Sequence, residues 1–284
     1  MAIERVFIVG SGMMGSSIAQ VAAEAEYSVT MMDIKEEFIG KGLASIEKSL
    51  GRKIKKGDIQ ESDKETIMSR IHTTLEVKDA QCADLVIEAV PEFLELKLNT
   101  FKELDRICQE HAILGSNTST LPISAIAAAT KRPSQVIGIH FMNPVPVIKG
   151  VEIIPSRHTS TEVLEASNSF VRSLGKEPCI AKDYGGFIVS RLVDALLNEA
   201  IRCLMDGNEA EEIDKAMRLC CNFPIGPLEL CDLVGAEIVF HGLETLRDEF
   251  GERFQPAPLL SSMIRSGDLG RKTGHGFYDY TQKS

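Results

Sequence analysis

The sequence has little positive charge, no long apolar run, and no cysteines at the spacing of a redox or metal motif. Its 31 lysines and arginines are outnumbered by 41 aspartates and glutamates, which leaves a net charge of −10. Because nucleic-acid-binding domains usually present a basic face, we expect no nucleic acid as partner. No apolar stretch approaches the ~20 residues that span a bilayer, and the N-terminus leads into a strand-like run without a signal peptide. These absences predict a cytoplasmic protein with no membrane-spanning segment.

The seven cysteines are odd in number and lack C-x-x-C spacing, which is unlike a disulfide framework. We expect all of them to be reduced packing residues, as is usual for an intracellular protein. No group of histidine, cysteine and aspartate residues has the spacing of a metal site, so we expect no metal cofactor.

Residues 6–33 have the pattern of a dinucleotide-binding unit. The apolar residues 6–9 predict a buried parallel strand, and residues 10–15 read Gly-Ser-Gly-Met-Met-Gly, a G-x-G-x-x-G motif. An apolar-periodic helix at 18–25 follows, and a second strand at 29–32 ends at Asp33. The strand before the glycines, the helix after them and the closing carboxylate make the motif far more specific than the glycines alone.

Each glycine of this loop has a physical task in such a site. Gly10 permits the tight turn, Gly12 lets a pyrophosphate approach the backbone, and Gly15 lets the helix pack closely on the strand. The helix N-terminus offers N–H groups to the phosphates, and the carboxylate at the end of the second strand can accept from ribose hydroxyls. We therefore expect the cofactor to contact Gly10, Gly12, Met13, Met14, Gly15 and Asp33.

The 284 residues suggest two domains, and the pattern of elements changes once along the chain. Further strand-like runs lie at 71–75, 85–89, 112–116, 136–140, 151–154 and 178–181, alternating with helical patterns at 36–53, 64–69, 95–108 and 161–174. Such alternation predicts a mostly parallel sheet covered on both faces. We place this α/β, Rossmann-type domain at residues 1–183, with a helix pair inserted at about 36–69.

The remaining residues, 184–284, read as an all-helical domain. Helical periods lie at 186–205, 209–221, 227–233, 236–250 and 258–265. The only later strand-like run is 277–278. Apolar stretches between residues 223 and 239 exceed what a domain of this size can bury alone, which favours a homodimer through these helices.

Three side chains with complementary chemistry lie at or near predicted strand ends. Ser119 follows the strand at 112–116, His140 ends the strand at 136–140, and Glu152 comes twelve residues later. An imidazole can take the hydroxyl proton of an alcohol while a hydride leaves for nicotinamide, and a carboxylate can orient that imidazole.

Each of these residues also has an ordinary interpretation. His140 can be a hydrogen-bonded histidine at a strand end, and Glu152 a surface carboxylate. Ser119 can be the N-cap of the helical run that begins at Pro122. Residues 52–56 form a basic stretch that is either a solvated helix face or an anion site at the edge of a cleft.

The sequence resembles the L-3-hydroxyacyl-CoA dehydrogenase family, especially the short bacterial 3-hydroxybutyryl-CoA dehydrogenases, from residue 6 to residue 280. The motifs that carry the resemblance are the glycine loop at 10–15, Val-Ile-Glu-Ala-Val-Pro-Glu at 86–92, Ser-Asn-Thr-Ser at 116–119, His-Phe-Met-Asn-Pro-Val-Pro at 140–146, Pro-Ile-Gly-Pro-Leu-Glu-Leu at 224–230 and Gly-Arg-Lys-Thr-Gly-His-Gly-Phe-Tyr at 270–278. The resemblance implies a Rossmann-type domain followed by a helical domain that dimerises. It also implies reversible oxidation of a short-chain L-3-hydroxyacyl-CoA by NAD, as part of fatty acid metabolism.

The resemblance also implies roles for individual residues. His140 becomes the catalytic acid–base residue, Glu152 its partner, and Ser119 a contact to the substrate oxygen. The cofactor-binding positions beyond the glycine loop are Glu92, Lys97, Asn117 and Asn143, and Asn143 also belongs to the substrate site. Lys53 and Lys56 match the basic stretch near the CoA phosphates.

Three positions depart from the family pattern, and the first two of them bear on the substrate. Ser190 stands where the family has a substrate-contacting asparagine, and Gly185 replaces a proline, which should loosen the hinge between the domains. Glu26 stands where the first helix usually ends in glycine. The alternatives are therefore a dehydrogenase of another 3-hydroxyacyl-CoA or 3-hydroxy acid, cyclic or branched, and a non-catalytic nucleotide-binding relative. The intact Ser119, His140 and Glu152 argue against the second.

Overall fold

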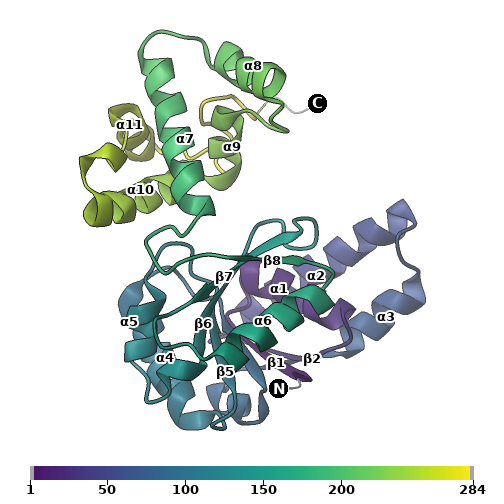
Figure 1. Cartoon of the computed structure of the whole chain (residues 1–284). Coiled ribbons are helices and arrows are strands. Elements are labelled where there is room, and N and C mark those ends of the chain that lie inside the picture. Colours follow the sequence, from purple (N-terminus) through teal and green to yellow (C-terminus); the bar gives the residue numbers. More distant parts are fainter. Residues whose placement is uncertain (1–2, 282–284) are drawn as a thin grey trace. The chain divides into compact units, whose positions relative to one another are not determined.

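The computed structural model describes residues 3–281 and consists of two compact units (Figure 1). The first unit ends at Asp183 and the second begins at Tyr184. Each unit has a hydrophobic core of its own, built from its own elements. Each therefore has the packing expected of a separate domain.

An eight-stranded sheet forms the centre of the first unit. Its strands are β1 (Arg5–Val9), β2 (Ser28–Met32), β3 (Ile71–Thr74), β4 (Leu85–Glu88), β5 (Ile113–Ser116), β6 (Val136–Phe141), β7 (Gly150–Pro155) and β8 (Glu177–Ile180). The order across the sheet is β3-β2-β1-β4-β5-β6-β7-β8. Strands β1 to β6 are parallel, β7 runs antiparallel to β6, and β8 runs parallel to β7. The predicted mostly parallel sheet is confirmed, and its strand order has the Rossmann crevice between β1 and β4.

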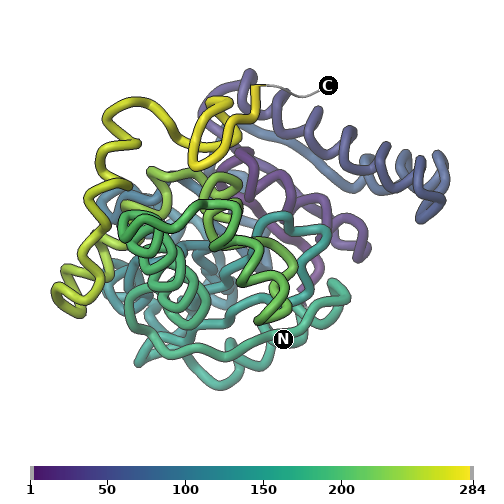
Figure 2. Tube along the Cα trace, turned by 90° about the horizontal axis from the view of Figure 1, so that it is seen from above, coloured from purple at the N-terminus to yellow at the C-terminus, as the bar shows by residue number. Residues whose placement is uncertain are grey.

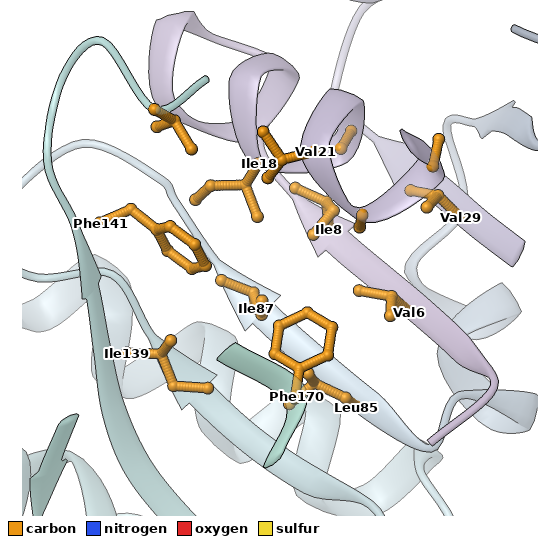
Figure 3. Packing of buried hydrophobic residues seen from close by; sticks show 14 of the residues in the cluster. Val6, Ile8, Ile18, Val21, Val29, Leu85, Ile87, Ile139, Phe141 and Phe170 are labelled. Carbon is orange, nitrogen blue, oxygen red and sulfur yellow. The ribbon is translucent and has the colours of Figure 1, made fainter. Parts of the chain in front are cut away.

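Helices cover both faces of this sheet. They are α1 (Met13–Glu24), α2 (Glu36–Lys56), α3 (Glu61–Ser69), α4 (Leu94–Ile107), α5 (Ile123–Ala128) and α6 (Thr161–Ser173), with short 3-10 turns at Val77–Cys82 and Pro133–Gln135. Figure 3 shows the core on one face, where Ile8, Ile87 and Ile139 of the strands pack with Ile18 of α1 and Phe170 of α6. Because strand side chains alternate, the residues next to these in sequence face the layer of α4 and α5.

The inserted pair α2 and α3 packs against α1, and its far end extends beyond the sheet in both views (Figures 1 and 2). Helix α2 ends at Lys56, and Gly57 follows in the left-handed conformation that commonly closes a helix. Glu26, after α1, also adopts a left-handed conformation, with φ of +71°. A glycine is more favourable there, which agrees with the glycine of the family pattern.

The second unit contains the helices α7 (Val189–Met205), α8 (Ala210–Cys221), α9 (Pro227–Val234), α10 (Ala236–Phe250) and α11 (Pro258–Ser266), with a 3-10 turn at Glu252–Phe254. The helical domain predicted from the sequence is confirmed. Residues 277–278 are not a strand. Instead, Asp232 accepts the N–H groups of Phe277 and Tyr278, each at 3.0 Å, while Asp214 accepts the hydroxyl of Tyr278 at 2.8 Å. Buried carboxylates therefore hold the C-terminal segment against the helices.

Helix α7 begins at Val189, later than the predicted residue 186, because Gly186 and Phe187 have left-handed backbones with φ of +69° and +47°. The N–H of Gly185 donates to Oε2 of Glu249 at 2.9 Å, a bond that the family's proline cannot make. The loosening expected of Gly185 is therefore offset by a hydrogen bond within the second unit.

All seven cysteines of the chain are free, as predicted. The expectation that all of them are packing residues is wrong, because only Cys108 and Cys231 are buried, whereas Cys82, Cys179, Cys220 and Cys221 are exposed. Within residues 3–281, no helix is both long and apolar enough to cross a bilayer. The same part of the chain has no cluster of three histidine, cysteine, aspartate or glutamate side chains suited to a metal ion.

Candidate active site

The hairpin of β6 and β7 brings His140 and Glu152 together. The two residues are directly opposite each other in the antiparallel register, so their side chains project to the same face. Nδ1 of His140 lies 2.8 Å from Oε2 of Glu152, and the residues are only 4% and 1% exposed. A carboxylate at Nδ1 favours the tautomer that carries its proton on that nitrogen, and it holds the ring in place.

The glycine loop has the geometry that a pyrophosphate needs. Gly10 has φ of +100°, a conformation that favours glycine. A Cβ on Gly15 would lie 1.8 Å from the carbonyl oxygen of Gly10, so only glycine lets α1 begin this close to β1. A Cβ on Gly12 would meet no atom within 4 Å, which leaves room for a phosphate. The N–H groups of Met13 and Met14 belong to the first turn of α1, where a helix binds anions.

Asp33 follows β2 and is fixed by its own neighbours. Its Oδ2 accepts the N–H and the hydroxyl of Ser11, both at 2.7 Å, and its Oδ1 accepts the N–H of Ile34 at 2.7 Å. The hydroxyl of Ser11 was not predicted to take part, although its place inside the glycine motif could have suggested it. The carboxylate is thus held at the end of β2, where a ribose is bound in this fold.

The segment after β5 presents one partly exposed side chain among buried ones. Ser116, Asn117, Thr118 and Thr120 are buried, whereas Ser119 is partly exposed. Oδ1 of Asn117 accepts the N–H of Phe141 at 2.9 Å, which joins this segment to the end of β6 beside His140. Ser119 is therefore partly exposed on a backbone that is held among buried residues.

Ser119 is not the N-cap of α5, so that interpretation is wrong. The cap position is Pro122, and Asp183 supplies the carboxylate: its oxygens accept the N–H groups of Ile123 and Ser124, each at 2.7 Å. Asp183 is sixty residues away in sequence from α5, so no local pattern could have identified it.

Glu92 and Lys97 form a network with Glu88, a residue that the sequence pattern did not single out. Nζ of Lys97 lies 2.6 Å from Glu88 and 3.2 Å from Glu92. Glu88 ends the apolar run of β4, and a lone carboxylate in such a buried run is the signal that could have revealed it.

The loop after β6 carries Asn143, which is exposed. Behind it, the buried Lys176 donates to the carbonyl oxygens of Val145 and Ile148, at 2.5 and 2.7 Å. Burial lowers the pKa of the Lys176 ammonium. This lysine, which sequence reasoning also missed, fixes the loop that positions Asn143.

The three remaining substrate candidates lie on helices. Nζ of Lys53 donates to both carboxylate oxygens of Glu24, at 2.8 and 2.6 Å, whereas Lys56 is exposed at the end of α2. Ser190 belongs to the second unit, where it is the second residue of α7 and partly exposed.

Two family models match the chain in succession. The model for the 3-hydroxyacyl-CoA dehydrogenase NAD binding domain matches residues 5–184. The model for the 3-hydroxyacyl-CoA dehydrogenase C-terminal domain matches residues 186–280.

Individual relatives are similar over the same length. The probable 3-hydroxybutyryl-CoA dehydrogenase of Deinococcus radiodurans is 43% identical over 275 residues, which cover 96% of this chain and 99% of that protein. The probable 3-hydroxybutyryl-CoA dehydrogenase of Bacillus subtilis is 42% identical over 286 residues and 100% of both proteins. The crystal structure of (S)-3-hydroxybutyryl-CoA dehydrogenase PaaH1 from Ralstonia eutropha is similar with a TM-score of 0.94 and 41% identity, over 99% of this chain and 100% of that chain. In both of its domains, the chain belongs to the 3-hydroxyacyl-CoA dehydrogenase family.

Proposed function

We propose that the protein transfers a hydride between NAD(H) and the 3-carbon of a short-chain acyl-CoA, interconverting 3-hydroxybutyryl-CoA and acetoacetyl-CoA. The observation that carries this proposal is the buried His140–Glu152 pair, which lies at the end of β6 in the same sheet whose β1 ends in the glycine loop. The names of the relatives support the substrate class.

The chain's own groups divide the proton chemistry between them. In the oxidation direction, Nε2 of His140 takes the proton of the 3-hydroxyl while the C3–H bond breaks with its electron pair. NAD⁺, when bound, supplies the acceptor for that hydride. Glu152 holds the ring through Nδ1 and stabilises the positive charge that the ring gains. Ser119 donates its hydroxyl hydrogen to the substrate oxygen and steadies it next to the imidazole.

The other proposed contacts follow the geometry of each residue. The glycine loop and the N-terminus of α1 receive the pyrophosphate, and Asp33 receives the ribose. Glu92, Asn117 and Asn143, in the loops after β4, β5 and β6, border the nicotinamide together with Lys97 in the first turn of α4. Of the two lysines proposed for the CoA phosphates, Lys56 has the exposed ammonium, whereas the ammonium of Lys53 is bound by Glu24.

A steady-state assay that follows NADH consumption with a panel of 3-oxoacyl-CoA esters tests this function. We expect the highest kcat/KM with acetoacetyl-CoA and lower values with long, branched and cyclic esters. A higher value for a branched or cyclic ester would favour the alternative dehydrogenase. Consumption of NADH with none of the esters would contradict a catalytic role.

We expect NADH to be preferred over NADPH by about tenfold or more in kcat/KM. A 2′-phosphate would bring negative charge next to the Asp33 carboxylate. The repulsion between these two negative groups in a partly buried site is unfavourable. Lys35, two residues after Asp33, carries a positive charge that softens the preference. Asp33→Asn is the matched variant and should narrow the ratio. Equal or better efficiency with NADPH in the unmodified enzyme would refute the role of Asp33.

We expect Ser190→Asn to raise kcat for acetoacetyl-CoA about three- to tenfold. Serine offers a single donor and reaches less far than the family's asparagine, so water fills the remaining space. In the variant, the longer asparagine side chain should displace this water and make a direct hydrogen bond to the substrate. Ser190→Ala serves as the control and should lower kcat. If Ser190→Asn instead leaves that rate alone and harms turnover of a larger ester, the space belongs to a bulkier acyl group. No change in either measurement would assign this position a structural role only.

We also propose that the protein is a homodimer through its helical unit and acts in the cytoplasm. Large apolar side chains are exposed on that unit, including Leu192, Leu219, Leu233, Val234 and Ile238. Apolar surface of this extent on a small domain usually marks an interface. Multi-angle light scattering at micromolar concentration should give twice the mass of 31.1 kDa. The mass of a single chain would refute the dimer.

A further inference from the structure

The carboxylate of Glu92 accepts hydrogen bonds from the segment that carries Ser119. Its Oε1 accepts the N–H of Ser119 at 2.8 Å and the N–H of Thr120 at 3.2 Å. The hydroxyl of Thr118 donates to the same oxygen. Hydrogen bonds to an ionised acceptor are roughly twice as strong as neutral ones. Three consecutive residues are therefore fastened to one charged atom.

The other side of the Glu92 carboxylate is fastened to the interior of the unit. Oε2 of Glu92 lies 3.2 Å from Nζ of Lys97, which is 1% exposed. That ammonium also donates to Oε1 of Glu88 at 2.6 Å and to the carbonyl oxygen of Val90 at 3.3 Å. Because an ammonium has three hydrogens, these three protein oxygens use its full donor capacity.

Glu88 closes the network at the ends of β4 and β5. It is fully buried, and its Oε2 accepts the hydroxyl of Ser116 at 2.7 Å. Its Oε1 accepts the N–H of Val90 at 2.8 Å as well as the ammonium of Lys97. A buried pair of charges is tolerated when both partners are fully hydrogen-bonded, as they are here. The segment of Ser119 is thus tied to two strands and to α4.

The charge of Glu92 persists at the pH where such an enzyme works. Burial raises the pKa of its carboxyl, but the charge of Lys97 and the hydrogen bonds from Thr118 and Ser119 outweigh burial, and the pKa lies below its ordinary value. About 38% of the Glu92 side chain is exposed, so this residue can be replaced without opening the core.

We propose that Glu92 is a positioning residue for Ser119, and that Lys97 and Glu88 support it from behind. By fixing the backbone of residues 118–120, the carboxylate holds the Ser119 hydroxyl where it meets the substrate oxygen. This inference rests on the proposed function. It gives Glu92 an effect on turnover in addition to the cofactor contact proposed for it, whereas Lys97, whose three hydrogens are all bound by the protein, acts through Glu92. A displacement of about 1 Å in such a group can lower a rate by ~10²-fold.

A double-mutant cycle of Glu92→Ala and Ser119→Ala tests the proposal in the full-length enzyme. We expect Glu92→Ala alone to lower kcat with acetoacetyl-CoA about tenfold or more. In the Ser119→Ala background it should have almost no further effect, because the group that it positions is gone. The dissociation constant of NADH should change less than about threefold, a limit well below the expected change in kcat. The chain has no tryptophan whose fluorescence could report binding, so binding is followed by the fluorescence of NADH itself.

Two further variants keep the result interpretable. Glu92→Gln retains an oxygen that can accept from Thr118 and from the backbone but loses the charge toward Lys97, so it should retain more kcat than Glu92→Ala. It also replaces the alanine variant in the cycle if that variant does not fold. Glu95→Ala, an exposed acid in the first turn of α4, is the matched control and should leave kcat unchanged.

Two results would overturn this inference but leave the proposed function intact. In the first, the double variant loses kcat by the product of the two single-variant factors, which would mean that Glu92 acts independently of Ser119. The other is a rise in the NADH dissociation constant at unchanged kcat, which would make Glu92 a cofactor contact only. Unchanged turnover in Ser119→Ala would instead overturn the proposed role of Ser119, and the inference with it.

Discussion

Replacing His140 with alanine is expected to lower kcat for acetoacetyl-CoA reduction by at least ~10³-fold. Without the imidazole, the 3-oxygen has no acid to protonate it as the hydride arrives, and water is a poorly placed substitute. The buried Glu152 also loses the partner that lies 2.8 Å from its Oε2. The measurement is a single-turnover or steady-state rate at saturating NADH.

The histidine variant needs a control for general loss of an imidazole and a check on folding. His158 is exposed in the loop after β7, so His158→Ala should keep near-normal turnover. The circular dichroism spectrum of His140→Ala should match that of the unmodified enzyme. Turnover within tenfold of normal in a folded His140→Ala enzyme would remove this residue from the mechanism.

The parts of the site that follow from local chemistry could be predicted from the sequence. Gly10 must be glycine because its φ is positive, and Gly15 must be glycine because α1 begins so close to the backbone of Gly10. Both requirements can be recognised from the residue types. The pair of His140 and Glu152 could be anticipated as chemistry, but its geometry depends on the antiparallel turn from β6 to β7. Nothing in the apolar residues of β7 indicates that this strand runs antiparallel to β6.

The parts that depend on long-range contacts could not be predicted. Asp183 caps α5 from sixty residues away, and Lys176 fixes the loop after β6 from a distance of about thirty residues, between α6 and β8. Each contact is made only after the sheet has formed. The late start of α7 has a different cause, since the left-handed backbones of Gly186 and Phe187 interrupt a sequence whose apolar period continues.

Changing Glu152 to glutamine is expected to lower kcat/KM about 10- to 100-fold while the fold is retained. Glutamine has nearly the same shape and can still accept from Nδ1 of His140, but it carries no charge to stabilise the imidazolium. A hydrogen bond to a charged group contributes about 1.5–3 kcal/mol, which corresponds to this range of rates. The effect should be large because both side chains are buried and solvent does not replace the missing charge.

The two directions of the reaction make this expectation stricter. Glutamine does not alter the overall equilibrium between the 3-hydroxy and 3-oxo esters, so kcat/KM must fall by the same factor in oxidation and in reduction. Glu152→Ala is the comparison that separates charge from orientation. It removes both, so it should lower the rate further than glutamine does. If glutamine and alanine are equally impaired, orientation carries the effect and the charge contributes little. If Glu152→Gln keeps near-normal kcat/KM in both directions, the carboxylate has no part in the chemistry, and the buried pair serves the packing of β6 against β7.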